Sequence, residues 1–263
     1  MSALTERFDA IWARIAKAVA GSGRPIGAVR LVAVSKNHSA ETVAELAAHW
    51  SGGSVRAGHC AGRPLFGESY MQEAREKMPA VRALLRCASV PDQNAPEWHF
   101  VGHVQSKKSR DIVGQFSLIH SVDSLKLAEA LRKAWQSRVA AAPLGLDEAA
   151  PARQNILIQV NVGREEQKSG VLPEALEPLI EGVAAMPELK LQGLMCIPPL
   201  AEIGGASRPY FVLLRQLRDK MESACGLSLP ELSMGMSDDF ETAVEEGATL
   251  VRIGTDIFGS RAF

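Results

Sequence analysis

The alternation of short apolar runs with helical segments constrains this 263-residue chain more than any other feature. Eight runs have the length of strands, and most are followed by apolar residues at helical spacing. Strands that alternate with helices indicate βαβ units and a parallel sheet. Eight such units fit one (β/α)8 barrel of ~250 residues, so residues 1–263 are expected to form a single domain. The expected strands are Leu31–Val34, Leu65–Gly67, His99–Gly102, Leu118–Ser121, Ile156–Asn161, Gln192–Ile197, Glu231–Gly235 and Leu250–Gly254.

An extra amphipathic helix is expected ahead of the first strand, over residues 1–21, with Gly21 placed to end it. Ser39 is placed to cap the next helix, and Ser69 with Gln72 has the spacing of a capping box. Pro178 inside a helical pattern predicts a helix that is kinked or starts late. Two Gly-, Ala- and Pro-rich segments are expected to be surface loops, namely His49–Pro64 and Ala140–Gln154.

Composition and charge exclude several classes of protein. With 46% hydrophobic residues and a formal net charge of −1, the chain is typical of soluble domains and lacks a broad nucleic-acid-binding charge. No apolar run approaches the ~18 residues of a membrane helix, and the first residues do not resemble a secretory signal. The four cysteines are far apart and are expected to be reduced thiols. A cytoplasmic protein is therefore expected, and the Asp238–Asp239 pair fits helix-start carboxylates better than a metal site.

The first candidate for chemistry is Lys36. In a parallel barrel, reactive residues lie at the carboxyl ends of strands. Lys36 directly follows the run from Leu31 to Ser35, so it is expected at the mouth of the first strand. A lysine there becomes a nucleophile when apolar surroundings or a neighbouring cation lower its pKa. Taken alone, Lys36 is explained as well by an ordinary solvated side chain.

The ends of the seventh and eighth strands offer a second candidate site. Residues 232–237 and 252–255 each end a strand and open a helix, with Gly, Ser or Thr at the turn. Free backbone N–H groups at such turns bind phosphate, and barrels often place a phosphate there. Ordinary turn chemistry is the alternative for each segment. Since closure of the barrel puts strand eight beside strand one, a phosphorylated aldehyde that condenses with Lys36 is a natural ligand.

Motifs along most of the chain carry a resemblance to a known family. These motifs are LVAVSK (31–36), FGESYMQE (66–73), WHFVG (98–102), IHSVD (119–123), QVNV (159–162), KSG (168–170), GLM (193–195), LSMGMSDD (232–239) and VRIGT (251–255). With these motifs, from about Leu31 to Arg261, the chain resembles the pyridoxal phosphate homeostasis protein family, relatives of the alanine racemase N-terminal barrel. The resemblance implies a fold-type III barrel for pyridoxal 5′-phosphate (PLP), without the racemases' C-terminal β domain.

The resemblance also implies roles for individual residues. Lys36 is the lysine that holds PLP as a Schiff base, and Arg252 aligns with an arginine that faces the pyridine nitrogen in the racemases. Met195 and Ile197 lie along the ring, or have a plain core role. Ser69 stands where the family usually has Asn. The candidate cofactor-binding residues are Lys36, Ser69, Met195, Ser233, Gly235, Ser237, Arg252, Gly254 and Thr255.

The resemblance favours a carrier over an enzyme. Racemases of this kind add a tyrosine from a second domain as a second base, whereas this chain stops at Phe263, and Tyr70 and Tyr210 do not resemble that base. We expect a monomer that binds, buffers and delivers PLP, with apoenzymes as further partners and no nucleic acid or membrane. The alternatives are a weak or narrow PLP-dependent amino-acid racemase, a PLP-free Schiff-base aldolase, and an interaction module that uses the basic cluster at 107–110.

Overall fold

Eight parallel strands close into one barrel in the computed structural model, which describes residues 2–52, 63–141, 153–199 and 207–259. Each strand pairs with the next along the chain, and β8 pairs with β1 to complete the ring, with Ala33 opposite Ile253. The expected (β/α)8 barrel is confirmed. The strands are β1 (Arg30–Val34), β2 (Leu65–Glu68), β3 (Glu97–Phe100), β4 (Leu118–Val122), β5 (Gln154–Val160), β6 (Leu189–Cys196), β7 (Glu231–Ser233) and β8 (Leu250–Ile253).

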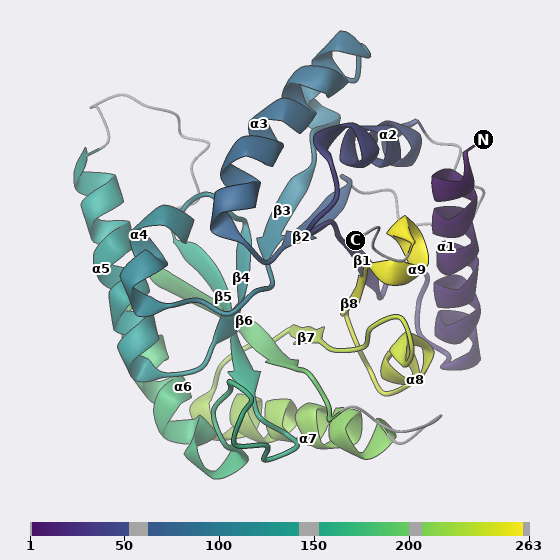
Figure 1. Ribbon diagram of the computed structural model, residues 1–263. Coiled ribbons are helices and arrows are strands. Elements are labelled where there is room, and N and C mark those ends of the chain that lie inside the picture. The colour runs from purple at the N-terminus through teal and green to yellow at the C-terminus, as the bar shows by residue number, and fades with distance from the viewer. Residues whose placement is uncertain (1, 53–62, 142–152, 200–206, 260–263) are drawn as a thin grey trace.

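Helices surround the barrel (Figure 1), and the buried apolar core includes residues of both the strands and the helices. The α-helices are α1 (Ala3–Gly21), α2 (Ala40–Ser51), α3 (Met71–Cys87), α4 (Ser109–Ile112), α5 (Leu125–Ala141), α6 (Leu176–Ala184), α7 (Arg208–Cys225), α8 (Phe240–Glu245) and α9 (Thr255–Phe258). Three 3-10 turns, η1 (Asp92–Asn94), η2 (Ser106–Lys108) and η3 (Pro173–Ala175), complete the described elements.

The extra helix α1 lies across the place where the barrel closes, with the purple helix beside the yellow α8 and α9 in Figure 1. Its buried stripe includes Phe8 and Trp12, whose rings meet the Trp50 ring of α2 at centroid distances of 4.8 and 6.0 Å. On its polar side, Arg7 Nε donates to the carbonyl of Ile257 at 2.8 Å. The expected N-terminal helix is therefore confirmed, and it fastens the two ends of the barrel together.

Four strands, β3, β5, β6 and β7, differ from the sequence-based expectation by two or three residues at one end or both. β3 begins at Glu97 and ends at Phe100, because the following Gly102 packs directly on Ser69: a Cβ on Gly102 would lie 2.3 Å from the Ser69 carbonyl oxygen. β7 ends at Ser233, before Gly235 turns into the left-handed region at φ 91°. β5 and β6 begin earlier than expected, at Gln154 and Leu189, and they pair over their whole length.

Several helix signals are confirmed and one is wrong. The Ser39 hydroxyl accepts from the Thr42 N–H at the start of α2, and α6 begins late, after a 3-10 turn, with Pro178 in its first turn. The predicted capping box of Ser69 and Gln72 is absent. Tyr70 occupies the cap position of α3 without a side-chain bond, since the contact with Gly102 keeps Ser69 outside the helix.

Both expected loops are shorter than predicted at their edges. His49, Trp50 and Ser51 form the last turn of α2, drawn inward by the aromatic cluster around Trp50. At the second loop, residues 140–141 belong to α5, and Gln154 is a buried β5 residue whose amide bonds Gly114 and Phe116. Residues 52, 63, 64 and 153 lie in no helix or strand, and the rest of these predictions, residues 53–62 and 142–152, lies outside the described residues.

Two further observations concern the described residues only. None of the helices they form is long and apolar enough to cross a membrane. Cys87, Cys196 and Cys225 are free thiols, whereas Cys60 lies in a segment that is not described.

Candidate functional site

Lys36 lies at the carboxyl end of β1, separated from the strand by Ser35 alone. This end of the barrel, where all eight strands finish, is called the C-terminal mouth below. Lys36 is half-buried and lines a cleft of about 660 Å³ together with Ser69, Tyr70, Gly102 and residues of α3 and α4. The predicted position of Lys36 is confirmed, and Ser69 lies beside it in the same cleft.

The backbone on both sides of Lys36 is held by a buried polar cluster. Ser35 Oγ donates to Glu68 Oε1 at 2.7 Å, and the Ser35 carbonyl accepts from Lys77 Nζ at 2.7 Å. On the other side, the Asn37 N–H donates to Glu73 Oε1 at 2.6 Å. Asn37 adopts a positive φ of 64°, which L residues rarely take without such support. The cluster therefore fixes the direction in which Lys36 leaves the strand.

The centre of this cluster is an ion pair with almost no access to water. Lys77 Nζ lies 2.8 Å from Glu68 Oε1 and 2.5 Å from Glu73 Oε1, and the Lys77 and Glu68 side chains are 5% and 0% exposed. Burial raises the pKa of Glu68, while the hydrogen bond from Lys77 opposes that rise. Glu68 Oε2 has no hydrogen-bond partner among the described residues. Because a buried carboxylate is costly without a cation, Glu68 depends on Lys77.

Two turns at the C-terminal mouth carry backbone donors that no described residue uses. After β7, the turn over residues 234–239 leaves the N–H groups of Ser237 and Asp238 without an acceptor. After β8, the N–H groups of Thr255 and Asp256 are free in the same way. The first turn requires glycine, since Gly235 has φ 91° and a Cβ there would lie 2.6 Å from that of Ala243. Such unused backbone donors suit an anion.

The β8 turn packs against the end of β1, close to Lys36 in the chain. A Cβ on Gly254 would lie 3.2 Å from the Val34 carbonyl oxygen, two residues before Lys36. Four residues further along each segment, the His38 and Phe258 rings stack with centroids 4.6 Å apart. The β7 turn joins the β8 segment through the Arg252 N–H, which donates to the Gly235 carbonyl at 3.0 Å. The amine and both turns thus belong to neighbouring strand ends.

Arg252 and Ser233 lie inside the barrel, beneath these turns. Arg252 is 5% exposed; its Nη1 donates to Ser233 Oγ at 2.6 Å and its Nη2 to the Cys196 carbonyl at 3.0 Å. Burial lowers the Arg252 pKa, but a guanidinium remains protonated. Met195 is buried in β6 opposite Ser233, and Ile197 follows the end of that strand, half-buried. Whether these side chains contact a ligand stays a prediction.

Sequence reasoning missed the polar residues that support the site. Glu68 lies in the motif at 66–73 and Lys77 lies just after it, but neither was given a role from the sequence. The buried residues His99 and His120 also lie in motifs and were likewise given no role. The available signal was a charged or imidazole side chain inside a strand that is otherwise apolar, since buried polar groups need partners. Among the described residues, no group of three or more His, Cys, Asp or Glu side chains is placed to hold a metal ion.

Known families and proteins match this chain over nearly its whole length. The family described as "Alanine racemase, N-terminal domain" matches residues 7–262. A pyridoxal phosphate homeostasis protein of Aquifex aeolicus is 38% identical over 98% of this chain and 98% of its own. The protein of that name from Pseudomonas aeruginosa is 40% identical over 100% and 98%, respectively.

Solved structures agree with these sequence matches. PipY of Synechococcus elongatus with PLP bound is 32% identical, covers 93% of this chain and 100% of its own, and has a TM-score of 0.70. Alanine racemase from Corynebacterium glutamicum is 18% identical with a TM-score of 0.58, so it shows the fold alone. This chain spans 62% of the racemase chain and 96% of its own length in that match.

Proposed function

The chain belongs to the alanine racemase N-terminal domain family, and on that premise we propose that it binds PLP as a Schiff base on Lys36. We propose further that it buffers and delivers PLP, and so acts in vitamin B6 and amino-acid homeostasis. Related proteins carry the name pyridoxal phosphate homeostasis protein, and one solved relative holds PLP. A cytoplasmic monomer that passes PLP to apoenzymes completes the proposal.

One observation supports this function most strongly: a half-buried amine and two turns with unused N–H donors meet at neighbouring strand ends. When bound, PLP supplies an aldehyde, which condenses reversibly with an amine. Lys36 provides that amine, and the open cleft admits a second amine that can take the aldehyde away. The cluster of Glu68, Glu73 and Lys77 holds the backbone on both sides of Lys36 in place.

The phosphate would be held by the two turns. The N–H groups of Ser237 and Thr255, with their hydroxyls, provide donors, while Gly254 and Gly235 allow the two turns to pack closely. An anion at such donors is stabilised by hydrogen bonds to its charged form. Anchoring the ligand by its phosphate leaves the aldehyde end to exchange, as a carrier requires.

In this proposal Arg252 would face the ring nitrogen, and Met195, Ser233 and Ser69 would provide further contacts. Because a guanidinium is charged at every relevant pH, Arg252 disfavours a proton on a facing ring nitrogen. An unprotonated ring withdraws electrons weakly, which suits holding PLP more than turning over an amino acid.

The test is the visible absorption of the purified protein after addition of PLP, followed by borohydride reduction and mass analysis of the peptide that contains Lys36. The wild type should gain a band and a reduced adduct on that peptide, and Lys36→Ala should gain neither. Lys108→Ala is the matched control, because Lys108 is a second amine on the same cleft. An unchanged band in Lys36→Ala would remove Lys36 from this role. A chain that stays colourless with PLP would favour the aldolase instead.

The phosphate anchor has its own test in competition with inorganic phosphate. Thr255→Ala together with Ser237→Ala removes both hydroxyls but keeps the backbone N–H groups, so it should weaken both PLP binding and competition by phosphate, while the reduced adduct on Lys36 still forms at high PLP. Equal competition in the wild type and the double variant would remove the two hydroxyls from the anchor.

One observation favours a second candidate, a weak PLP-dependent racemase. Tyr70 is 54% exposed and lines the same cleft as Lys36, where its hydroxyl is available for proton transfer. Exchange of the Cα hydrogen of a panel of amino acids in D₂O distinguishes the two. The carrier proposal expects almost none, whereas exchange that disappears in Tyr70→Phe would establish the enzyme.

A further inference from the structure

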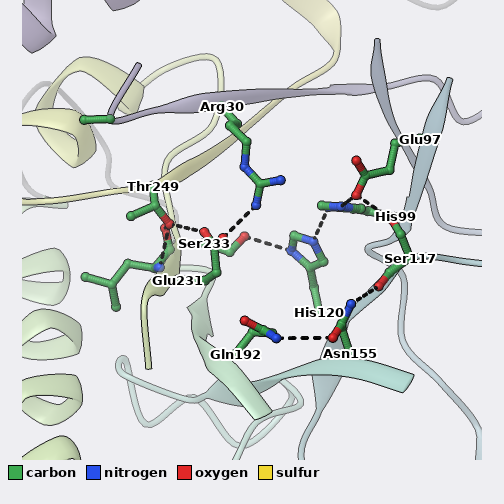
Figure 2. Close-up of polar contacts among 12 residues, drawn as sticks. Arg30, Glu97, His99, Ser117, His120, Asn155, Gln192, Glu231, Ser233 and Thr249 are labelled. Atoms are coloured by element: carbon green, nitrogen blue, oxygen red, sulfur yellow. Dashed lines mark hydrogen bonds and ion pairs between the residues drawn. The ribbon is translucent and has the colours of Figure 1, made fainter. Parts of the chain in front are cut away.

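A chain of hydrogen bonds runs through the interior of the barrel away from the candidate site. It begins at Arg252 Nη1, which lies 2.6 Å from Ser233 Oγ. Ser233 Oγ is 2.9 Å from His120 Nδ1, His120 Nε2 is 2.9 Å from His99 Nδ1, and His99 Nε2 is 3.2 Å from Glu97 Oε1. Figure 2 shows the links from Ser233 to Glu97. The chain thus connects β8, β7, β4 and β3.

The other end of the chain lies at the opposite, N-terminal end of the barrel. Glu97 is the first residue of β3, and its Oε1 also accepts from Ser117 Oγ at 2.8 Å. Glu97 and His99 line a polar cavity of about 170 Å³ with Arg30 and Glu231. Arg252, Ser233, His120 and His99 are buried, so water reaches this chain mainly at Glu97.

The direction of every hydrogen bond in this chain follows from its first member. A guanidinium only donates, so the Ser233 oxygen accepts from Arg252. The Ser233 proton then points to His120 Nδ1, the one other partner recorded for this hydroxyl among the described residues. His120 must therefore carry its proton on Nε2 and donate to His99 Nδ1. His99 in turn carries its proton on Nε2 and donates to Glu97.

The charges agree with this direction. Burial lowers the pKa of His120 well below its usual value and also lowers that of His99, so both rings are neutral. The hydrogen bond from His99 is the largest cause that lowers the pKa of Glu97 to about 2, so Glu97 is ionised. A cation at one end, an anion at the other and neutral links between them polarise each bond in the same sense.

We propose that His120 and His99 are positioning residues for Arg252, which they hold through the hydroxyl of Ser233. Since Ser233 gives its proton to His120, its oxygen is committed to accepting from Arg252. The Cys196 carbonyl accepts from the second Nη at 3.0 Å, and the two contacts together fix the plane of the guanidinium. Its remaining N–H donors then keep one orientation toward the ring nitrogen. The expected effect on PLP rests on the proposed function, whereas the direction of the hydrogen bonds does not.

The first experiment uses the protein without PLP. Nitrogen-15 NMR of histidine-labelled protein distinguishes the two neutral tautomers and the charged ring. At neutral pH, His99 and His120 should both show a proton on Nε2 alone, and His120 should stay neutral between about pH 5 and 8, the range in which an ordinary histidine titrates. A proton on Nδ1 of His120, or a charged His120 ring within that range, would overturn the proposed direction of the hydrogen bonds whatever the protein binds.

The second experiment measures the visible band of bound PLP, its pH dependence and the PLP dissociation constant. His120→Phe removes the acceptor for Ser233 and should shift the band's pH midpoint and weaken PLP binding roughly tenfold, about 1.4 kcal/mol. His120→Gln is the rescue variant, because its amide oxygen and nitrogen can accept and donate in the same order as the ring. Thr249→Val alters the neighbouring network of Glu231 and should leave the spectrum unchanged.

A double-mutant comparison separates positioning from general packing. If His120 acts through Arg252, adding His120→Phe to Arg252→Met should change the spectrum no further than Arg252→Met alone. A folded His120→Phe protein with a wild-type spectrum and pH midpoint would overturn the positioning role. Failure of the wild type to bind PLP would instead refute the proposed function. The tautomer measurement would still test the direction of the hydrogen bonds from Arg252 to Glu97.

Discussion

Replacing Lys77 by Met tests whether the buried ion pair behind Lys36 holds the barrel together. The substitution keeps an unbranched side chain, one atom shorter, but removes the cation that lies 2.8 Å from Glu68, a carboxylate with 0% exposure. Breaking a buried pair by removing one partner costs about 3–5 kcal/mol, because the remaining charge stays buried. Lys77 also bonds the Ser35 carbonyl and Glu73, so the upper half of that range is expected. The melting temperature should fall by about 8–20 °C for a chain of this size.

The pH dependence of this loss has a definite sign. Burial already raises the pKa of Glu68, and without Lys77 it rises further. A carboxyl whose folded pKa exceeds its unfolded value contributes most stability below the unfolded value, 4.5, and loses it as pH rises through the folded pKa. The deficit of Lys77→Met relative to the wild type should therefore be largest near neutral pH and should shrink toward pH 4.5.

Urea unfolding of the apo protein, followed by circular dichroism at neutral pH and near pH 5, provides the measurement. The matched control is Lys77→Met with Glu68→Gln, in which the amide oxygen still accepts from Ser35 and the fully buried carboxylate is absent. This double variant should recover a large part of the lost stability. A loss below about 1 kcal/mol for Lys77→Met, or additive losses in the double variant, would refute the reasoning.

Three further predictions follow from local geometry. Glu97, whose pKa falls to about 2, contributes stability that is present above pH 4.5 and lost as pH falls toward 2, so urea titrations of Glu97→Gln should show a flatter acid profile than the wild type. Gly193→Ala would place a Cβ 1.9 Å from the Glu231 carbonyl oxygen at φ 154°, so the yield of folded protein should collapse, whereas Gly21→Ala, with open space around it, should fold normally. Ser39→Ala removes the hydroxyl that accepts from the Thr42 N–H and should cost about 1 kcal/mol in thermal unfolding, and no change in melting temperature would contradict this capping role.

The sequence was sufficient for the barrel because its strands are short apolar runs between helical patterns. β1 and β8, for example, are 5 and 4 residues long, and Val32 and Val251 are buried. The positions of strand ends were harder to predict from the sequence, because they depend on contacts between distant segments. β3 stops at Phe100 because Gly102 must lie on Ser69, and no local pattern shows that contact.

The same division holds for the candidate site. The position of Lys36 could be predicted from the sequence, since a lysine that directly follows a strand can be recognised in the chain. The supports of that lysine were not, because Glu68 and Lys77 acquire their partners only when β2 and α3 pack behind β1. His99 and His120 come from two different strands, and only barrel closure brings them to Ser233 and Arg252.

The fastening of α1 across the closing strands has a consequence for how this protein is made. Arg7 meets its acceptor 250 residues later in the chain, and Arg14 pairs with Glu241 and Asp256. On a ribosome, the nascent helix can find Trp50 early, but its other partners, Glu241 among them, emerge more than 200 residues later. Closing so long a loop is slow, and half-made barrels expose strand edges until it happens. Chaperone demand should therefore fall sharply once α9 has left the exit tunnel.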